Sequence, residues 1–348
     1  MISLELLMRI CGIEAVVLIL AVALVCGHVL WLWREQRWSW PQLIRGWAIL
    51  AATLDGPVPP PADLKWLGSL PVRLQIRLFT SIPVSPTGLG RERITRVAQI
   101  IGLLSRVETL CGSPLWWQRL QGGRLFTLFG GGWEYMHTLL RDPHPLVRAQ
   151  AAEWAVEHPH LGVINSLLTL LDDGHALCRV KAQDSLLRMG SVVKEPLYRY
   201  LISHPDSGVE AGLRVAAGLA DQRFLPVAIH LCRDASPRVR VLATELMGAV
   251  GGREAVDMLT RLLKGADPEV RAAAARSLGK LGHWPAATTL VALLQDRRFE
   301  VRWEAGLALQ ALGAPGMLWL RRALVLTGEG GKEWGSPSRA GVGVETQP

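Results

Sequence analysis

The sequence predicts an all-α protein in which one N-terminal transmembrane helix precedes an α-solenoid of about six to seven helix pairs. Two observations carry this prediction. An apolar run near the N-terminus is long enough to cross a bilayer, and a short phrase recurs about every thirty-one residues in the second half of the chain. Around each recurrence, apolar residues lie three and four positions apart, as in a helix that buries one face.

The apolar run extends from Ala15 to Trp33 and contains a single titratable residue, His28. We therefore expect residues 1–40 to form a transmembrane anchor. A cleaved signal peptide is the alternative, but no pair of small residues at the spacing of a cleavage site follows the run. Indoles favour the headgroup zone, and tryptophans gather at one end of the run: Trp31, Trp33, Trp38 and Trp40.

Arginines that flank the run set its expected orientation. Arg34, Arg37 and Arg45 follow it, and positively charged flanks remain in the cytoplasm. The prediction is a single-pass protein of the cytoplasmic (inner) membrane with its C-terminal domain in the cytoplasm. The formal net charge is +8, yet residues 142–326 carry 22 Lys and Arg against 19 Asp and Glu. The excess near the anchor favours anionic lipid as a partner and argues against nucleic acid.

Residues 41–89 are expected to form a Pro-rich spacer beside the membrane. Asp55–Leu64 reads DGPVPPPADL, and prolines disfavour both helix and strand. At the other end, the Gly- and Ser-rich tail of residues 327–348 has too few apolar groups to order itself.

Residues 90–130 are expected to form a degenerate repeat that caps the stack, because terminal repeats are atypical. One period before the first clear repeat lies Trp117, and Glu92–Leu110 has the pattern of the helix that would precede it.

Residues 131–326 are predicted to form the solenoid itself. Each unit supplies two helices, and the second contains a phrase such as EVRAAAARSL, which starts at Glu269. Proline and aspartate mark the turn before this helix, where proline suits the first helical turn. Glycine, a helix stop signal, follows it in four units. The third residues of the phrases lie 31, 31, 30, 31 and 31 positions apart: Arg148, Arg179, Glu210, Arg240, Arg271 and Arg302.

These units resemble HEAT repeats of the short bacterial kind that also occurs in phycobilisome lyases. The resemblance covers about Gly131 to Leu326 and rests on the phrase D-x-x-x-x-V-R followed by A-A and L-G. In that family, the turn aspartate and the arginine six residues later form a ladder of hydrogen bonds between neighbouring repeats. The resemblance implies this role for four pairs: Asp142/Arg148, Asp173/Arg179, Asp234/Arg240 and Asp296/Arg302.

Two units depart from the ladder pattern. Arg271 has Gly265 in place of the aspartate, and Glu210 replaces the arginine opposite His204. We therefore expect a weaker joint near Ser203 to Val215. The same reasoning predicts that Arg240→Ala lowers stability by about 1–2 kcal/mol more than Arg271→Ala, because only Arg240 would lose a paired charge.

The sequence contains no catalytic arrangement, and we expect neither an enzyme nor a cofactor. The HEAT fold holds iron where His-Glu pairs recur, as in deoxyhypusine hydroxylases, but none of the nine histidines here precedes a glutamate. Glu157, His158 and His160 are a candidate ligand set, although Pro159 favours a solvated loop there. The five cysteines contain no C-x-x-C pair, so neither disulfides nor a zinc site is expected.

The second helices carry two rows of residues that share one face, because the rows are four positions apart. Val241 and Trp303 belong to the first row, and Glu245 and Arg276 belong to the second. The rows fit either the packing between helices or the floor of a groove for a helix or an extended peptide. Near the same end, Trp284 and Trp319 are further candidates for aromatic anchors.

The predicted function is that of a non-enzymatic, membrane-anchored scaffold that binds a protein partner, not a small-molecule substrate. A membrane synthase such as a polysaccharide glycosyltransferase is one example of such a partner. The alternatives are a phycobilin-lyase-like protein that handles a chromophore and a helical-repeat enzyme that acts on nucleic acid. The excess of only three positive charges in residues 142–326 argues against the second.

Overall fold

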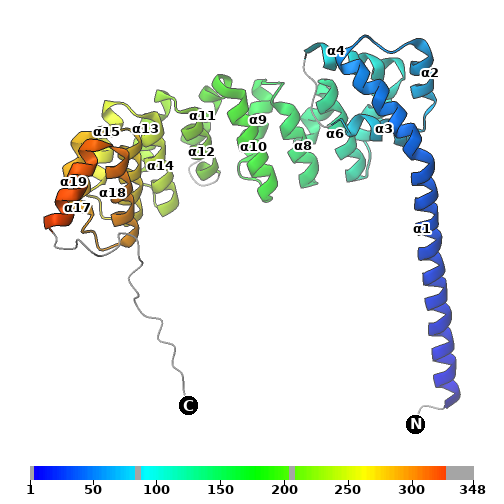
Figure 1. Ribbon diagram of the computed structural model, residues 1–348, viewed down its shortest axis with the longest axis horizontal. Coiled ribbons are helices and arrows are strands. Elements are labelled where there is room, and N and C mark those ends of the chain that lie inside the picture. Colours follow the sequence, from blue (N-terminus) through cyan, green and yellow to red (C-terminus); the bar gives the residue numbers. More distant parts are fainter. Residues whose placement is uncertain (1–3, 83–87, 204–207, 327–348) are drawn as a thin grey trace. The chain divides into compact units, whose positions relative to one another are not determined.

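The computed structural model describes residues 4–82, 88–203 and 208–326, apart from the side chains of residues 4–16, 31–32, 35–36 and 323–326. Every regular element in these ranges is a helix, which confirms the predicted all-α class. The chain divides into two compact units, Met1–Leu139 and Leu140–Pro348. Figure 1 shows the helices of both units.

The first unit begins with a helix of 52 residues, whose C-terminal part is packed against its neighbours. Leu43 and Leu50 on this helix are buried, and Arg93 donates a hydrogen bond to the carbonyl of Leu54 at 3.3 Å. The helices of this unit are α1 (Leu4–Asp55), α2 (Pro61–Ser69), α3 (Val72–Thr80), α4 (Gly88–Ile100), α5 (Leu103–Cys111), α6 (Trp116–Phe129) and α7 (Trp133–Leu139).

The predicted transmembrane anchor, and with it the predicted inner-membrane location, is contradicted. Within the described residues, no helix combines the length and the apolar character needed to cross a bilayer.

The segment 41–89 differs from the predicted spacer, because it contains the end of α1 and the helices α2 and α3. Pro61 occupies the first turn of α2, where a missing N–H costs nothing. The buried amide of Gln75 then closes the α2–α3 turn by donating to the carbonyls of Leu67 and Leu70 at 3.0 and 3.1 Å. Arg106 donates to the oxygen of the same amide at 3.2 Å.

The helix predicted over Glu92–Leu110 is divided into α4 and α5. Gly102 separates them with φ of +72°, a left-handed conformation that glycine adopts readily. The apolar periodicity continues across Gly102, so it did not indicate the break between the two helices.

The second unit is a stack of helix pairs, which confirms the predicted α-solenoid. In Figure 1 its second helices follow one another in sequence order from α8 to α18. These second helices are α8 (Pro145–Ala155), α10 (Ala176–Met189), α12 (Val209–Leu219), α14 (Pro237–Val250), α16 (Pro268–Lys280) and α18 (Phe299–Ala311). The first helices are α9 (Leu161–Leu170), α11 (Lys194–Ser203), α13 (Leu225–Leu231), α15 (Arg253–Leu262) and α17 (Ala287–Leu293), and α19 (Ala314–Leu326) ends the stack.

Four of the second helices are followed by a glycine with positive φ, as the glycine register predicts, whereas α8 ends at Val156 in the right-handed α conformation and α12 ends at a non-glycine residue with positive φ. The glycines have φ between +65° and +71°, and they are Gly190, Gly251, Gly282 and Gly313. At the corresponding place, α12 ends at Ala220 with φ of +47°. An L-residue in this conformation is strained by roughly 1–2 kcal/mol.

Ala220→Gly is therefore expected to raise the stability of the second unit, although the added freedom of the unfolded chain offsets part of the gain. We expect a net gain of up to about 1 kcal/mol, measurable as a higher Tm by circular dichroism. Ala217→Gly, within the same helix, is the control and should lower stability by about 1 kcal/mol. A lower Tm for Ala220→Gly would contradict the proposed strain.

Candidate functional site

Arginines at the start of the second helices tie successive repeats together. The Nη1 atom of Arg148 donates to the carbonyls of Asp142 and Pro143 in its own turn, at 2.7 and 3.0 Å. Its Nε and Nη2 atoms donate to the two carboxylate oxygens of Asp173 in the next repeat, at 2.7 and 2.8 Å. The same carboxylate accepts from the backbone N–H of His175 at 2.8 Å, so the next turn holds it in place.

This geometry corrects the predicted pairing. Each of these arginines donates to the backbone carbonyl of the residue six positions earlier and not to a carboxylate there. Three of them also have a carboxylate partner, which belongs to the following repeat: Arg148, Arg240 and Arg271. Arg271 is therefore not unpaired: it donates to Gly265 O at 2.9 Å and to both oxygens of Asp296 at 2.9 and 3.0 Å. Since a carbonyl is available from any residue, the glycine at position 265 costs Arg271 nothing.

The aspartate that pairs with Arg240 was missed as a ladder residue. Arg240 donates from Nε to Asp267 at 3.0 Å, and Asp267 also caps its own helix by accepting from Glu269 N at 3.0 Å. A search for an aspartate 25 to 27 positions after each arginine would have found all three pairs. The predicted difference between Arg240→Ala and Arg271→Ala thus has no basis in the structure.

The ladder aspartates are held in their charged form. Burial alone raises the pKa of Asp173, but hydrogen bonds from Arg148 and from the backbone of His175 outweigh it, so the pKa lies below its ordinary value. The pKa values of Asp267 and Asp296 are lowered in the same way, by Arg240 and Arg271 respectively. The three joints therefore remain ion pairs at neutral pH.

The joint around α12 differs from the others. Glu210, at the arginine position, pairs with Arg238 at 2.8 Å and with Arg214 at 3.6 Å. Its predicted counterpart, His204, lies outside the described residues. The weaker joint near Ser203 to Val215 stays a prediction.

The predicted groove residues Glu245 and Arg276 form one bridge across three second helices. Arg276 on α16 donates to Glu245 on α14 at 2.8 Å and to Glu304 on α18 at 2.7 Å. Glu304 was missed because it belongs to neither row. It lies three residues before Leu307, the member of the second row on α18, and therefore on the same helix face. These charges are already paired, so a partner that covers them has no isolated charge to desolvate.

The apolar candidates do not form one cluster. Trp303, near the start of α18, is 43 % exposed, and its ring is stacked 6.1 Å from that of Phe299. Trp284 is 66 % exposed and precedes α17. The helices α17 and α18 are consecutive and antiparallel, so the start of α17 lies at the opposite end of the pair from the start of α18. Along the helix axes, Trp284 is therefore separated from Trp303 by about the length of α17, roughly 10 Å. Trp319 belongs to α19, where the guanidinium of Arg322 lies 5.8 Å from its ring.

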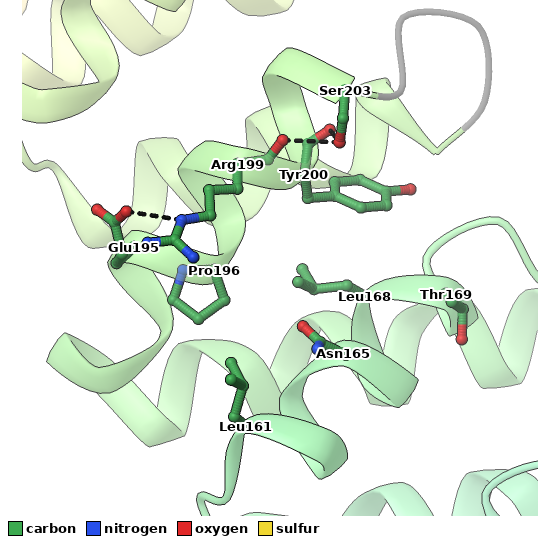
Figure 2. A pocket seen from close by; sticks show the side chains of 9 residues that line it. All are labelled: Leu161, Asn165, Leu168, Thr169, Glu195, Pro196, Arg199, Tyr200 and Ser203. Atoms are coloured by element: carbon green, nitrogen blue, oxygen red, sulfur yellow. Dashed lines mark hydrogen bonds and ion pairs between the residues drawn. The ribbon is translucent and has the colours of Figure 1, made fainter.

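A cavity of about 560 Å³ lies between the first helices α9 and α11, and sequence analysis did not find it. Figure 2 shows apolar side chains beneath a rim on which Glu195 and Arg199 form an ion pair at 2.9 Å. The sequence pattern drew attention to the second helices, whereas this cavity lies between first helices, and Leu161 of α9 is exposed at it. The lining residues are Leu161, Asn165, Leu168, Thr169, Glu195, Pro196, Arg199, Tyr200 and Ser203.

The candidate metal ligands have structural contacts. His158 stacks on Trp154 with ring centroids 4.0 Å apart, and its Nδ1 lies 3.1 Å from the Trp154 carbonyl. His160 is the residue before the first turn of α9. Over the described ranges, no group of three or more His, Cys, Asp or Glu side chains is placed to hold a metal ion.

Comparisons with known proteins support the repeat assignment. A sequence profile of HEAT repeats matches residues 258–320, and no curated protein matches the chain. Kap121p bound to Pho4p has a similar fold, with a TM-score of 0.53 and 14% identity over 82% of this chain and 39% of that one. Yeast importin-beta (Kap95p) gives a TM-score of 0.50 and 13% identity over 83% of this chain and 48% of that one.

The complex of CpcE and CpcF of phycocyanin lyase from Nostoc gives a TM-score of 0.34 with 15% identity, over 64% of this chain and 94% of that one, which is too distant to support an argument. The present chain spans less than half the length of Kap121p and of importin-beta. At these identities the likenesses show the fold alone. The second unit is thus a helical solenoid that contains HEAT repeats, a class of fold suited to protein interaction.

Proposed function

We propose that this chain is a non-enzymatic scaffold whose solenoid binds a protein partner on the exposed side of α14, α16 and α18. The observation that carries the proposal is the combination of exposed Trp303 and Leu307 with the bridge from Glu245 through Arg276 to Glu304. Apolar side chains that lie beside already paired charges can be covered at a low desolvation cost.

The repeat architecture supports this proposal in a second way. Each repeat contacts its neighbours, so the second helices present a continuous surface over several units, as in other solenoids that bind extended partners. Kap121p, which has a similar fold at low identity, is bound to the protein Pho4p in its structure. This likeness supports a protein partner for the present fold without identifying one.

The test measures how Trp303→Ala changes binding of a partner protein. The partner is first identified by cross-linking to the full chain and is then purified. If Trp303 is an anchor, the variant should bind the partner more weakly by about 1 kcal/mol or more, roughly fivefold, with an unchanged Tm. Trp284→Ala is the matched control, because Trp284 is exposed but lies at the other end of the α17–α18 pair. Equal losses for both variants, or turnover of a small molecule that is lost on changing His158, would contradict the proposal.

A further inference from the structure

The groove between the first helices α13 and α15 contains a cavity of about 410 Å³, and every residue that lines it is described. Ile229 on α13 and Met258 on α15 are half-buried and supply its apolar part. The charged side chains that line it are all exposed and all come from α15: Arg253, Glu254, Asp257 and Arg261. The groove therefore combines a small apolar surface with four charges that a partner can reach.

The same five helix positions line this cavity and the cavity between α9 and α11. On α11 they are occupied by Glu195, Pro196, Arg199, Tyr200 and Ser203. On α15, with identical spacing, Arg253 takes the place of Glu195 and Asp257 takes the place of Arg199. The groove thus occurs twice on the first helices of the stack, with the order of one charge pair reversed.

The order of these charges affects whether they pair within the helix. An acidic residue four positions before a basic one forms a better pair than the reverse order, and Glu195 pairs with Arg199 at 2.9 Å (Figure 2). On α15, Arg253 precedes Asp257, and neither side chain forms an ion pair with any described residue. The side chain of Arg261, four positions after Asp257, is likewise in no ion pair within the described ranges. The three charges are therefore available to a partner.

We propose that this groove docks a helix of a protein partner that presents an acidic, a basic and an acidic side chain at successive four-residue intervals. The acidic groups pair with Arg253 and Arg261, the basic group pairs with Asp257, and an apolar side chain packs between Ile229 and Met258. Residues four apart rise about 6 Å along any α-helix, so the partner's charges match those of α15 in either direction. The inference goes beyond the proposed function, because it concerns first helices, whereas the proposed surface lies on second helices.

Charge favours this occupant over a segment of one sign. The lining carries two arginines and two carboxylates, so a wholly acidic segment would meet Glu254 and Asp257, and a wholly basic one would meet Arg253 and Arg261. Like charges in close contact oppose binding. An uncharged segment would cover the four charges without pairing them, which costs their desolvation. A helix of alternating sign avoids both costs.

The probe is an alanine-based helical peptide that carries Glu, Lys and Glu at four-residue intervals, with a leucine beside the lysine. Its fluorescein-labelled form is titrated with the full chain, and binding is followed by fluorescence anisotropy. We expect saturable binding with a Kd near or below about 1 mM. A second peptide with Lys, Glu and Lys at the same positions should bind more weakly by about fivefold or more, because each of its charges then meets a like charge.

Asp257→Lys in the chain should weaken binding of the first peptide by about fivefold or more, because the peptide lysine then faces a lysine. Replacing that peptide lysine by glutamate should restore binding to the variant while weakening binding to the unchanged chain. A general loss of structure would not produce this exchange of preference.

Asp184→Lys is the matched control, since it makes the same change of charge at another exposed aspartate within a helix, but on α10 and away from this cavity. It should leave peptide binding unchanged, as should Trp303→Ala, and the Tm of each variant shows whether the chain remains folded. Absence of saturable binding, equal binding of the first two peptides, or binding that Asp257→Lys leaves unaffected in a folded chain would overturn the inference. If partner binding then still depends on Trp303, the proposed function stands without it.

Discussion

Arg271→Ala is expected to destabilise the second unit by about 2–4 kcal/mol, because it removes one partner of a largely buried ion pair. The side chains of Arg271 and Asp296 are only 15% and 10% exposed. Without the arginine, the Asp296 carboxylate keeps its contact with Arg298 N at 2.9 Å but loses both charged hydrogen bonds. Two turn carbonyls, those of Gly265 and Ala266, lose their donor as well.

The measurement is chemical denaturation followed by circular dichroism, with hydrogen exchange to locate the loss at the α16–α18 joint. Arg302→Ala is the matched control: Arg302 contacts turn carbonyls, and no carboxylate pairs with it in the described chain. We expect the control to cost about 1 kcal/mol. Equal costs for the two variants would show that the carboxylate of the next repeat contributes nothing to the joint.

Trp154→Ala is expected to cost about 3–5 kcal/mol, the usual range for deleting a large buried aromatic side chain. Trp154 on α8 is 1% exposed and is stacked on His158 with an angle of 13° between the ring planes. Its removal leaves a cavity beneath α8 and frees the imidazole. Because solenoid stability is largely a sum over neighbouring interfaces, the loss should be concentrated in the repeats nearest α8.

Trp284→Ala tests the same substitution on a tryptophan that is 66% exposed, and we expect it to change stability by less than about 0.5 kcal/mol. Unfolding followed by tryptophan fluorescence and circular dichroism compares the two variants. A small loss for Trp154→Ala would mean that α8 repacks around the missing ring and that its burial is not essential to the stack.

The helix pairs were predictable because their signals are local. Periodic apolar residues, proline in the first turn of α14 and α16, and left-handed glycines such as Gly251 each act within a few residues of chain. The same local reasoning failed at Gly102, where one backbone conformation divides α4 from α5. It also failed at Asp55–Leu64, because a proline that is unfavourable inside a helix is favourable in the first turn of one, as Pro61 is in α2.

The candidate site was predictable only in part. The rows on the second helices led to Arg276 and Glu245, but their mutual ion pair and its extension to Glu304 depend on how α14, α16 and α18 are spaced. The cavity between α9 and α11 could be located only from the structure, because residues of two different repeats line it. Likewise, residue type could not distinguish the buried Trp154 from the exposed Trp284.

The sequence by itself determined the all-α class, the repeat of about thirty-one residues and the positions of the ladder arginines, because helix periodicity and capping operate over one or two turns of chain. Only the tertiary structure decided which carboxylate each arginine meets, and it placed Asp296 against Arg271 where the sequence pattern had left that arginine unpaired. The physical reason is the stacking of repeats. A guanidinium donates to whichever groups lie within about 3 Å, and the packing of one repeat on the next, not the spacing within a repeat, sets those distances.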